Sequence, residues 1–258
     1  MASKPKSVIL AALITGASAG IGAAYAKQLA AKGTDLVLVA RDEARLNSLA
    51  QELKTAHNIN VEVLPADLSD RFQLDKVATR AAREDIDLVI NNAGFGIKQP
   101  FAGGALDAEQ NLLDVLVTAV MRITHSALPG MLARDRGGVI NVSSIAGWMS
   151  SGTYSATKSW ATTFSESLAT LHKDSNVHVM ALCPGYTRTE FHSRAEMEIQ
   201  TIPNWMWLDV DHVVKRSLSD FAKSKPVSVP GAQYKVLSLI AQYLPRPLVR
   251  KISVTSRR

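Results

Sequence analysis

One short stretch restricts the fold more than any other, because it joins an apolar strand to a helix through a glycine-rich turn. Residues 8–15 form an apolar run that predicts a buried strand, and residues 21–32 predict a helix. Between them lie Gly16, Gly20 and Gly22. Glycines let backbone N–H groups approach a pyrophosphate, and a helix N-terminus adds partial positive charge there. The stretch therefore predicts an α/β fold that binds a dinucleotide; a glycine-rich turn without a ligand is the alternative.

A second stretch carries side chains suited to carbonyl and alcohol chemistry. Residues 139–142 predict a buried strand, Ser144 follows it closely, and residues 155–171 predict a helix. Tyr154 and Lys158 are four residues apart, so they lie on one face and can meet at one substrate. A neighbouring ammonium lowers the pKa of a phenol, and a serine hydroxyl can polarise a carbonyl. The alternative is that Tyr154 and Lys158 are surface residues of an amphipathic helix.

Residues 15–22, the Asn-Asn-Ala-Gly segment at 91–94, and the pair Tyr154 and Lys158 occur together in this chain. In this combination the chain resembles the short-chain dehydrogenase/reductase family over nearly its whole length. The resemblance implies a doubly wound Rossmann-type α/β fold with a parallel sheet of about seven strands, over residues 1–230. The site is expected at the carboxyl edge of the sheet.

The resemblance also implies the reaction, a reversible hydride transfer between a nicotinamide and a carbonyl carbon. Tyr154 would donate the proton, while Lys158 would depress the pKa of Tyr154 and hold the nicotinamide ribose. Ser144 would hold the carbonyl oxygen, because it directly precedes Ile-Ala-Gly as the catalytic serine does in the family pattern. Ser143 is the competing choice.

The end of the second predicted strand, residues 35–40, favours NADP over NAD. NAD-binding folds place an acidic side chain there for the ribose 2′-hydroxyl, whereas this chain has Ala40 followed by Arg41. An arginine can pair with a 2′-phosphate, although Arg41 could also be a solvated residue at a helix start. The resemblance assigns Asp67 to the adenine. It assigns further cofactor contacts to Gly16, Ser18, Gly20, Ile21, Gly22, Leu68, Asn91, Ala93, Gly94, Tyr154, Lys158, Pro184, Gly185, Thr187 and Thr189.

The chain departs from the family pattern in two places. Residues 107–131 predict one long helix, and the family usually has an asparagine in its middle that kinks the helix and holds a water for proton relay. Here Leu116 stands at that position, and Asn111 lies more than a turn earlier. The loop 144–154 is also a few residues shorter than in most members, which narrows one wall of the pocket.

The segment after the predicted strand 177–182 points to an apolar substrate. Residues 184–189 resemble the loop on the nicotinamide side, and residues 190–209 resemble the substrate lid of the family. The lid is rich in large apolar side chains: Phe191, Met197, Ile202, Trp205, Met206 and Trp207. These favour a lipophilic ketone, aldehyde or 3-oxoacyl group, although the rings could simply pack on the core. Cys183 is expected to be an inert packed residue.

The remaining periodic segments complete the alternation of strands and helices. Helices are predicted over 43–57, 74–83 and 210–223, and strands over 61–64, 86–90 and 226–229.

Charge is concentrated at the C-terminus, within the apolar tail at 231–258 and just before it. The net charge is +6, but eight lysines and arginines and no acidic residue follow Asp220, so residues 1–220 carry −2. Such a tail could contact a second subunit of a homodimer or homotetramer, or an anionic membrane. A nucleic-acid partner is not expected, because no motif for one accompanies the charge.

Cysteine usage and the apolar runs favour a cytoplasmic protein. The single cysteine excludes an internal disulfide framework and a cysteine-rich metal site, and no apolar run is expected to span a bilayer. Two other functions stay open: an NADPH sensor that no longer catalyses, suggested by Leu116, and a membrane-surface interaction protein, suggested by the tail.

Overall fold

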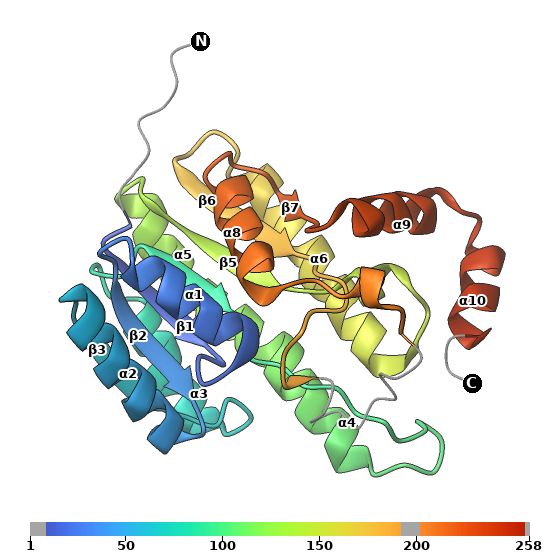
Figure 1. Cartoon of the computed structure of the whole chain (residues 1–258), viewed down its shortest axis with the longest axis horizontal. Helices are drawn as coiled ribbons and strands as arrows, with labels where there is room; N and C mark the ends of the chain where they lie inside the picture. The colour runs from blue at the N-terminus through green and yellow to red at the C-terminus, as the bar shows by residue number, and fades with distance from the viewer. Residues whose placement is uncertain (1–8, 192–201, 256–258) are drawn as a thin grey trace.

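The computed structural model describes residues 9–191 and 202–255, which form a seven-stranded sheet with helices on both faces (Figure 1). The strands are β1 (Ala11–Thr15), β2 (Asp35–Ala40), β3 (Val61–Pro65), β4 (Leu88–Asn91), β5 (Gly137–Val142), β6 (Val177–Leu182) and β7 (Val227–Ser228). The α-helices are α1 (Gly20–Ala30), α2 (Glu43–His57), α3 (Arg71–Ala81), α4 (Leu106–Leu113), α5 (Ala119–Ala133), α6 (Gly152–Leu171), α8 (Val210–Phe221), α9 (Ala232–Tyr243) and α10 (Arg246–Thr255). Three shorter helices are η1 (Asp114–Thr118, π), η2 (Ile145–Trp148, 3₁₀) and η3 (Asn204–Met206, 3₁₀).

The sheet is parallel throughout and confirms the doubly wound Rossmann-type fold. Its strand order is β3-β2-β1-β4-β5-β6-β7. The chain therefore builds outward from β1 to β3 and then returns to add β4 on the other side of β1. Ligands bind at such a switch point, outside the carboxyl ends of the strands. The turn after β1 and the segment after β4 both lie at this point.

Alternate strand residues separate the core into two layers. In β1, Ala12 and Ile14 pack with α1, α2 and α8 on one face, whereas Ala11 and Leu13 pack with α3 and α5 on the other. The same alternation continues through β2, β4, β5 and β6. Because both faces are covered, every residue of β1 is buried, as expected for a parallel sheet. This apolar packing is the largest stabilising contribution that the sheet makes.

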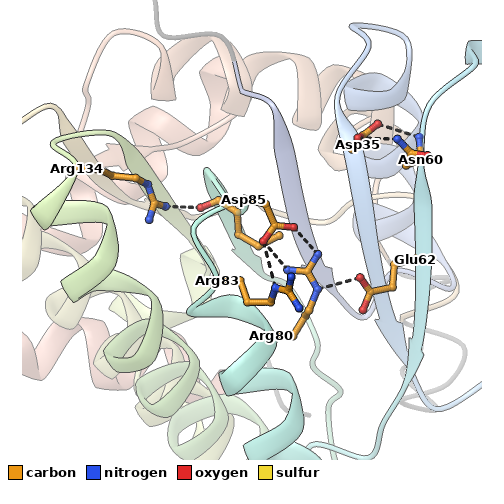
Figure 2. Close-up of polar contacts among 8 residues, drawn as sticks. Asp35, Asn60, Glu62, Arg80, Arg83, Asp85 and Arg134 are labelled. Carbon is orange, nitrogen blue, oxygen red and sulfur yellow. Dashed lines mark hydrogen bonds and ion pairs between the residues drawn. The ribbon is translucent and has the colours of Figure 1, made fainter.

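Charged side chains gather at the amino edge of the sheet, opposite the switch point (Figure 2). Asp35, the first residue of β2, accepts from the Asn60 backbone N–H at 2.8 Å. Arg80, at the end of α3, donates to Glu62 and to Asp85 at 2.8 Å each. These pairs join the ends of neighbouring elements, and they leave the carboxyl edge free for the site.

Three predicted elements have the expected bounds, and the others differ from the prediction by one to three residues at one or both ends. β2, α2 and β6 begin and end where the sequence indicates. α3 begins three residues earlier than predicted, because the Asp70 side chain accepts from the Gln73 N–H and so caps the helix. α6 also begins early, at Gly152, and therefore contains Tyr154 in its first turn instead of placing it in the preceding loop.

The predicted long helix is present, but it is not regular. α4, η1 and α5 follow one another without a break, and the backbone N–H of Ala119 bonds to the Asp114 carbonyl, five residues earlier. The combined helix, Leu106–Ala133, is long and apolar enough to cross a membrane by length and composition. The expectation that no such run exists is therefore wrong. Residues such as Leu112, Ile123 and Met131 are buried against the sheet, as in a core helix.

The C-terminal helices extend from the body beside β7 (Figure 1). The predicted boundary at residue 231 falls within the fold, since Tyr234 in the first turn of α9 is fully buried and belongs to the core. The other side of α9 is exposed and apolar, and Tyr243 at its end is 84% exposed. The beginning of the predicted tail thus packs on the domain, whereas its outer face does not.

Candidate active site

The turn between β1 and α1 is built so that only glycine fits at its key positions. Gly16 has φ +64°, and a Cβ there would lie 2.8 Å from Ala93 Cα. A Cβ on Gly22 would lie 2.3 Å from the Gly16 carbonyl oxygen. Ala19 precedes α1 and gives its N-terminus no side-chain cap. The first N–H groups of α1 can therefore bind the pyrophosphate of a dinucleotide, so this turn fits NAD(P).

Asn92 joins the turn to the end of β4. Its side-chain N–H groups donate to the carbonyls of Thr15 and Gly16, at 2.9 and 3.1 Å. The Thr15 hydroxyl in turn accepts from the backbone N–H groups of Asn92 and Ala93, at 2.9 and 3.0 Å. These bonds tie the end of β1 to the end of β4. They also fix the distance between the turn after β1 and the segment after β4, which together form the switch point.

Asn91 has an interior role in this structure. It is 3% exposed, and its side chain donates to Asn141 at 2.8 Å and to Thr124 at 3.1 Å. The side chain of Asn141 continues this chain of bonds to Ser165 on α6. A contact between Asn91 and the cofactor, as the resemblance implies, would therefore fall to its backbone.

Arg41 and Asp67 lie together at the carboxyl ends of β2 and β3. The Arg41 side chain is 74% exposed, and its Nη1 lies 3.8 Å from Asp67 Oδ2. Burial alone would raise the pKa of Asp67, but hydrogen bonds from Ser69 and the Arg41 guanidinium outweigh it and hold that pKa below its usual value. The following residue, Leu68, is buried, and Ser18 is half-buried in the glycine-rich turn. Arg41 keeps most of its guanidinium free to meet an anion.

The two serines after β5 have different surroundings. The Ser143 hydroxyl is buried, donates to the Lys158 carbonyl at 2.6 Å and bonds to Thr162 at 2.8 Å. The Ser144 hydroxyl caps η2 by accepting from the Ala146 N–H at 3.1 Å. Ser144 also hydrogen-bonds the Tyr154 phenol. Ser143 is thus occupied against α6, and Ser144 is the serine that meets Tyr154.

Lys158 lies one turn after Tyr154 on α6. Its Nζ is 5.7 Å from the centre of the Tyr154 ring and donates to the Val142 carbonyl at 2.7 Å. Burial lowers the pKa of Lys158 to about 8, and the nearby Cys183 offsets this only in part. The Val142 carbonyl, which the sequence pattern does not reveal, therefore anchors the ammonium beside the phenol.

The pKa of Tyr154 differs from the expectation. Burial raises the pKa of this phenol to about 12, and the hydrogen bond with Ser144 offsets the rise only in part. The prediction that Lys158 depresses the pKa of Tyr154 is therefore wrong for this structure, because desolvation of the phenolate dominates and the opposing contribution comes from Ser144. At neutral pH the phenol keeps its proton, which is the form that can donate one.

Leu116 lies at the middle of the π-helical segment η1 and is buried. A Cβ on Gly94 would lie 3.6 Å from Leu116 Cδ1 and 3.8 Å from Lys158 Nζ. The helix is irregular at the position where the family kinks it, and the side chains of Leu116 and Lys158 both border Gly94. Asn111 lies in the preceding helix α4.

Cys183 is buried, and the pKa of its thiol is raised to about 11 by burial. The sulfur lies 3.6 Å from the Thr162 hydroxyl. A thiol in these surroundings stays protonated and is not a nucleophile, in agreement with the sequence analysis.

The loop after β6 meets the rest of the site at both ends. The Ile145 N–H donates to the Pro184 carbonyl at 3.1 Å, which links η2 to this loop. At the other end, a Cβ on Gly20 would lie 3.2 Å from the Thr189 side chain. Thr187 is buried and forms a parallel bridge with Leu208. The loop therefore runs from the serine turn to the glycine-rich turn, and it could contact a dinucleotide between the nicotinamide and the pyrophosphate.

The lid is described only in part, since residues 192–201, including Met197, lie outside the described residues. Near its beginning, Phe191 packs near Tyr154 with ring centres 6.0 Å apart. Near its end, Trp207 lies 5.8 Å from Tyr186, whereas Trp205 is 64% exposed. Phe191 thus borders the candidate phenol, while Trp205 faces outward.

Comparison with known protein families gives one match over most of the chain. The model of the short chain dehydrogenase family matches residues 10–199. A very-long-chain 3-oxoacyl-CoA reductase of Laccaria bicolor is 34% identical over 175 residues, 65% of this chain and 52% of that protein. An uncharacterized oxidoreductase of Staphylococcus epidermidis is 31% identical over 74% of this chain and 86% of its own length. The chain spans only 52–60% of the length of the first three reductases of the former kind.

Solved structures are similar to this chain in both fold and sequence. A short-chain dehydrogenase from Sphingobium yanoikuyae in complex with NADPH has a TM-score of 0.83 and 33% identity, covering 90% of this chain and 93% of that one. A bulky-bulky ketone specific alcohol dehydrogenase from Comamonas testosteroni has a TM-score of 0.80 and 30% identity, covering 92% and 93%. Both likenesses extend well beyond the residues that the family model matches.

Proposed function

Because the chain belongs to the short-chain dehydrogenase family and is an oxidoreductase that acts on CH–OH and C=O groups, we propose that it reduces lipophilic carbonyl compounds with NADPH. The observation that carries the proposal is the meeting of three groups: the Ser144 hydroxyl on the Tyr154 phenol, with the Lys158 ammonium alongside. These groups come from the end of β5 and from α6, next to the turn that fits a dinucleotide.

Each group has a separate part in the proposed reaction. The nicotinamide, when bound, supplies the hydride. Ser144 holds the carbonyl oxygen by hydrogen bonding, and Tyr154 donates its proton to that oxygen as negative charge develops. Lys158 then stabilises the phenolate, because it is held by the Val142 carbonyl and cannot swing away. A phenol that keeps its proton up to about pH 12 suits donation in the direction of reduction.

The preference for NADPH rests on Arg41. Its exposed guanidinium next to Asp67 could pair with a 2′-phosphate, and the NADPH complex of the Sphingobium protein supports this choice. Arg41→Ala should weaken NADPH binding roughly 10-fold or more, as expected for loss of a charge-assisted pair, and leave NADH binding unchanged. Arg71→Ala, which removes another exposed arginine, is the control. Equal efficiency with both cofactors in the wild type would contradict the preference.

The proposed substrate class rests on apolar side chains at the lid and on the relatives. Phe191 beside Tyr154 and the ring pair of Tyr186 and Trp207 favour an apolar substrate. The names of two relatives, a very-long-chain 3-oxoacyl-CoA reductase and a bulky-ketone alcohol dehydrogenase, point the same way. A panel of ketones, aldehydes and 3-oxoacyl thioesters of increasing chain length should show kcat/KM rising with apolar size. A flat response would remove this part of the proposal.

An NADPH sensor that does not catalyse is the second candidate, and Leu116 favours it. The apolar side chain stands where the family has the asparagine of the proton relay. Turnover of any carbonyl on the panel by the wild-type protein would exclude a purely sensory role. NADPH binding without turnover on the whole panel would favour it.

The outer face of the C-terminal helices suggests contact with a second subunit or with an anionic membrane. The protein itself is proposed to be cytoplasmic. Val236, Leu239 and Ile240 on α9 are exposed, and Arg250 and Lys251 lie on α10. Deletion of residues 244–258 should reduce either the oligomer size or the sedimentation with anionic vesicles. A change in neither would leave the tail without a role in association.

A further inference from the structure

The first turn of α9 carries a tyrosine that the sequence places only at the start of an apolar tail. Tyr234 is fully buried, and its ring lies against Gly185, where a Cβ would come within 2.1 to 2.3 Å of three ring atoms. Only glycine therefore allows this approach. The C-terminal part of the chain thus reaches the loop that the resemblance places on the nicotinamide side.

The Tyr234 hydroxyl binds two further segments at once. It donates to the Met206 carbonyl at 2.5 Å and accepts from the Tyr186 backbone N–H at 3.1 Å. Its neighbour Gln233 donates from its side chain to the Trp205 carbonyl at 3.2 Å. The beginning of α9 therefore holds both η3, at the end of the lid, and the loop after β6.

The two segments held by Tyr234 also run beside each other. The Leu208 N–H donates to the Tyr186 carbonyl at 2.8 Å, and the Arg188 N–H donates to the Leu208 carbonyl at 3.0 Å. Leu208 also lies close to the turn into α9, since a Cβ on Gly231 would come 2.9 Å from its side chain. The Tyr234 hydroxyl, which binds Tyr186 and Met206, fixes one end of the paired segments 186–188 and 206–208.

We propose that Tyr234 is a positioning residue for the reduction, because it fixes the C-terminal end of the lid to the loop beside the nicotinamide. The inference rests on the proposed function, since it assigns the lid to a carbonyl substrate. Without the hydroxyl, the Met206 carbonyl and the Tyr186 N–H would lose their buried partner. The lid end would then move relative to the loop, whereas the glycine-rich turn that binds the pyrophosphate would stay in place.

Tyr234→Phe tests this role, because it keeps the ring and removes only the hydroxyl. The KM for a carbonyl substrate should rise about 10-fold, because the two buried hydrogen bonds of the hydroxyl are lost. The kcat should change less than about 3-fold, and the Kd for NADPH less than about 2-fold. Hydrogen exchange at the Tyr186 amide, measured without substrate, should become faster. Tyr243→Phe on the exposed end of the same helix is the matched control and should change none of these.

The measurements separate the possible failures. If Tyr234→Phe lowers the melting temperature but leaves KM and the Tyr186 exchange as in the wild type, the residue is only structural and the inference is wrong. An equal loss of NADPH affinity would also overturn it. If the wild type reduces no carbonyl compound, the proposed function fails by itself, while the exchange measurement still reports whether Tyr234 holds the loop.

Discussion

At the scale of single residues, burial decides more of the chemistry than charge does. Lys158 is buried and Tyr154 is half-buried, and this desolvation raises the pKa of the phenol to about 12 and lowers that of the ammonium to about 8. Both shifts favour the neutral form of the group. The pair therefore provides a protonated acid and a cation whose charge is sensitive to mildly alkaline pH.

The two adjacent serines provide a matched pair of variants. Ser144→Ala should lower kcat roughly 100-fold, because Ser144 meets the phenol and would hold the substrate oxygen. Ser143→Ala should leave kcat within about 3-fold but destabilise the protein by about 1–2 kcal/mol, since it removes two buried hydrogen bonds. Steady-state kinetics and thermal unfolding of both variants check this. The reverse pattern would make Ser143 the catalytic serine.

The lowered pKa of Lys158 predicts how the reaction depends on pH. Its ammonium is charged below about pH 8 and loses its proton above it, so the rate of carbonyl reduction should fall as the pH rises through about 8. Folding disfavours the charged form of Lys158, so below about pH 8 the buried ammonium lowers the free energy of unfolding. This destabilisation is relieved as the pH rises from about 8 toward the ordinary lysine value of about 10.4.

A pH–rate profile for reduction checks the Lys158 prediction. Lys158→Met should remove the alkaline decrease together with most of the rate. A wild-type profile that is flat between pH 7 and 9 would contradict the assignment of about 8 to this lysine.

At the scale of elements, the sequence predicts those helices, strands and turns that are determined by residues nearby in the chain. The strand, turn and helix of residues 8–32 follow from apolar runs and glycines, and the structure confirms them where it describes them. The early start of α6 could not be predicted, because no side-chain cap marks its first residue. The roles of Val142 and Tyr234 could not be predicted either, since their contacts join segments far apart in the chain.

The glycine-rich turn makes a prediction about cofactor binding. Gly22→Ala should raise the Kd for NADPH by about 10-fold or more, because its Cβ would meet the Gly16 carbonyl at 2.3 Å and displace the turn. Gly33→Ala, at the other end of the same helix, is the control. Gly33 has φ +78° and no heavy atom within 4 Å of the added Cβ, so the change should cost about 1 kcal/mol of stability and leave the NADPH affinity unchanged. Fluorescence titration with NADPH measures both; an unchanged affinity in Gly22→Ala would exclude the turn from the site.

At the scale of the whole molecule, one sheet brings the site together from segments between residues 16 and 234. The overall fold was predictable because alternating buried strands and amphipathic helices cover the chain, and the resemblance gave their order. The position of the tail was not predictable, since its apolar residues could equally pack against the core or form an exposed surface. Tyr234 is buried and Tyr243 is exposed on the same helix.

A buried carboxylate stabilises the edge of the sheet at β7. Asp220 on α8 is 2% exposed and pairs with Arg216 at 2.9 Å and Lys225 at 2.8 Å. Burial alone would raise the pKa of Asp220, but these partners and the Ser228 hydroxyl lower it below its usual value. Its contribution to stability is therefore present above the ordinary carboxyl value of about 4 and is lost as the pH falls through the lowered one.

Asp220→Asn should accordingly destabilise the protein by about 3 kcal/mol at neutral pH, as expected when one partner of a buried pair is removed. The difference from the wild type should shrink at acidic pH. Asp211→Asn, an exposed residue on the same helix, should change the free energy of unfolding by less than about 0.5 kcal/mol. Urea unfolding at several pH values measures both, and a difference that does not depend on pH would show that Asp220 is not charged in the fold.

The central claim is that Tyr154 donates the proton while the rest of the site binds and orients. Single-turnover oxidation of NADPH by a lipophilic aldehyde, followed by the loss of reduced-nicotinamide fluorescence, tests it most directly in the wild type and in Tyr154→Phe. The account predicts rapid oxidation in the wild type and a rate lower by roughly 1,000-fold in the variant, with the NADPH affinity unchanged. Equal single-turnover rates in the two proteins would contradict it.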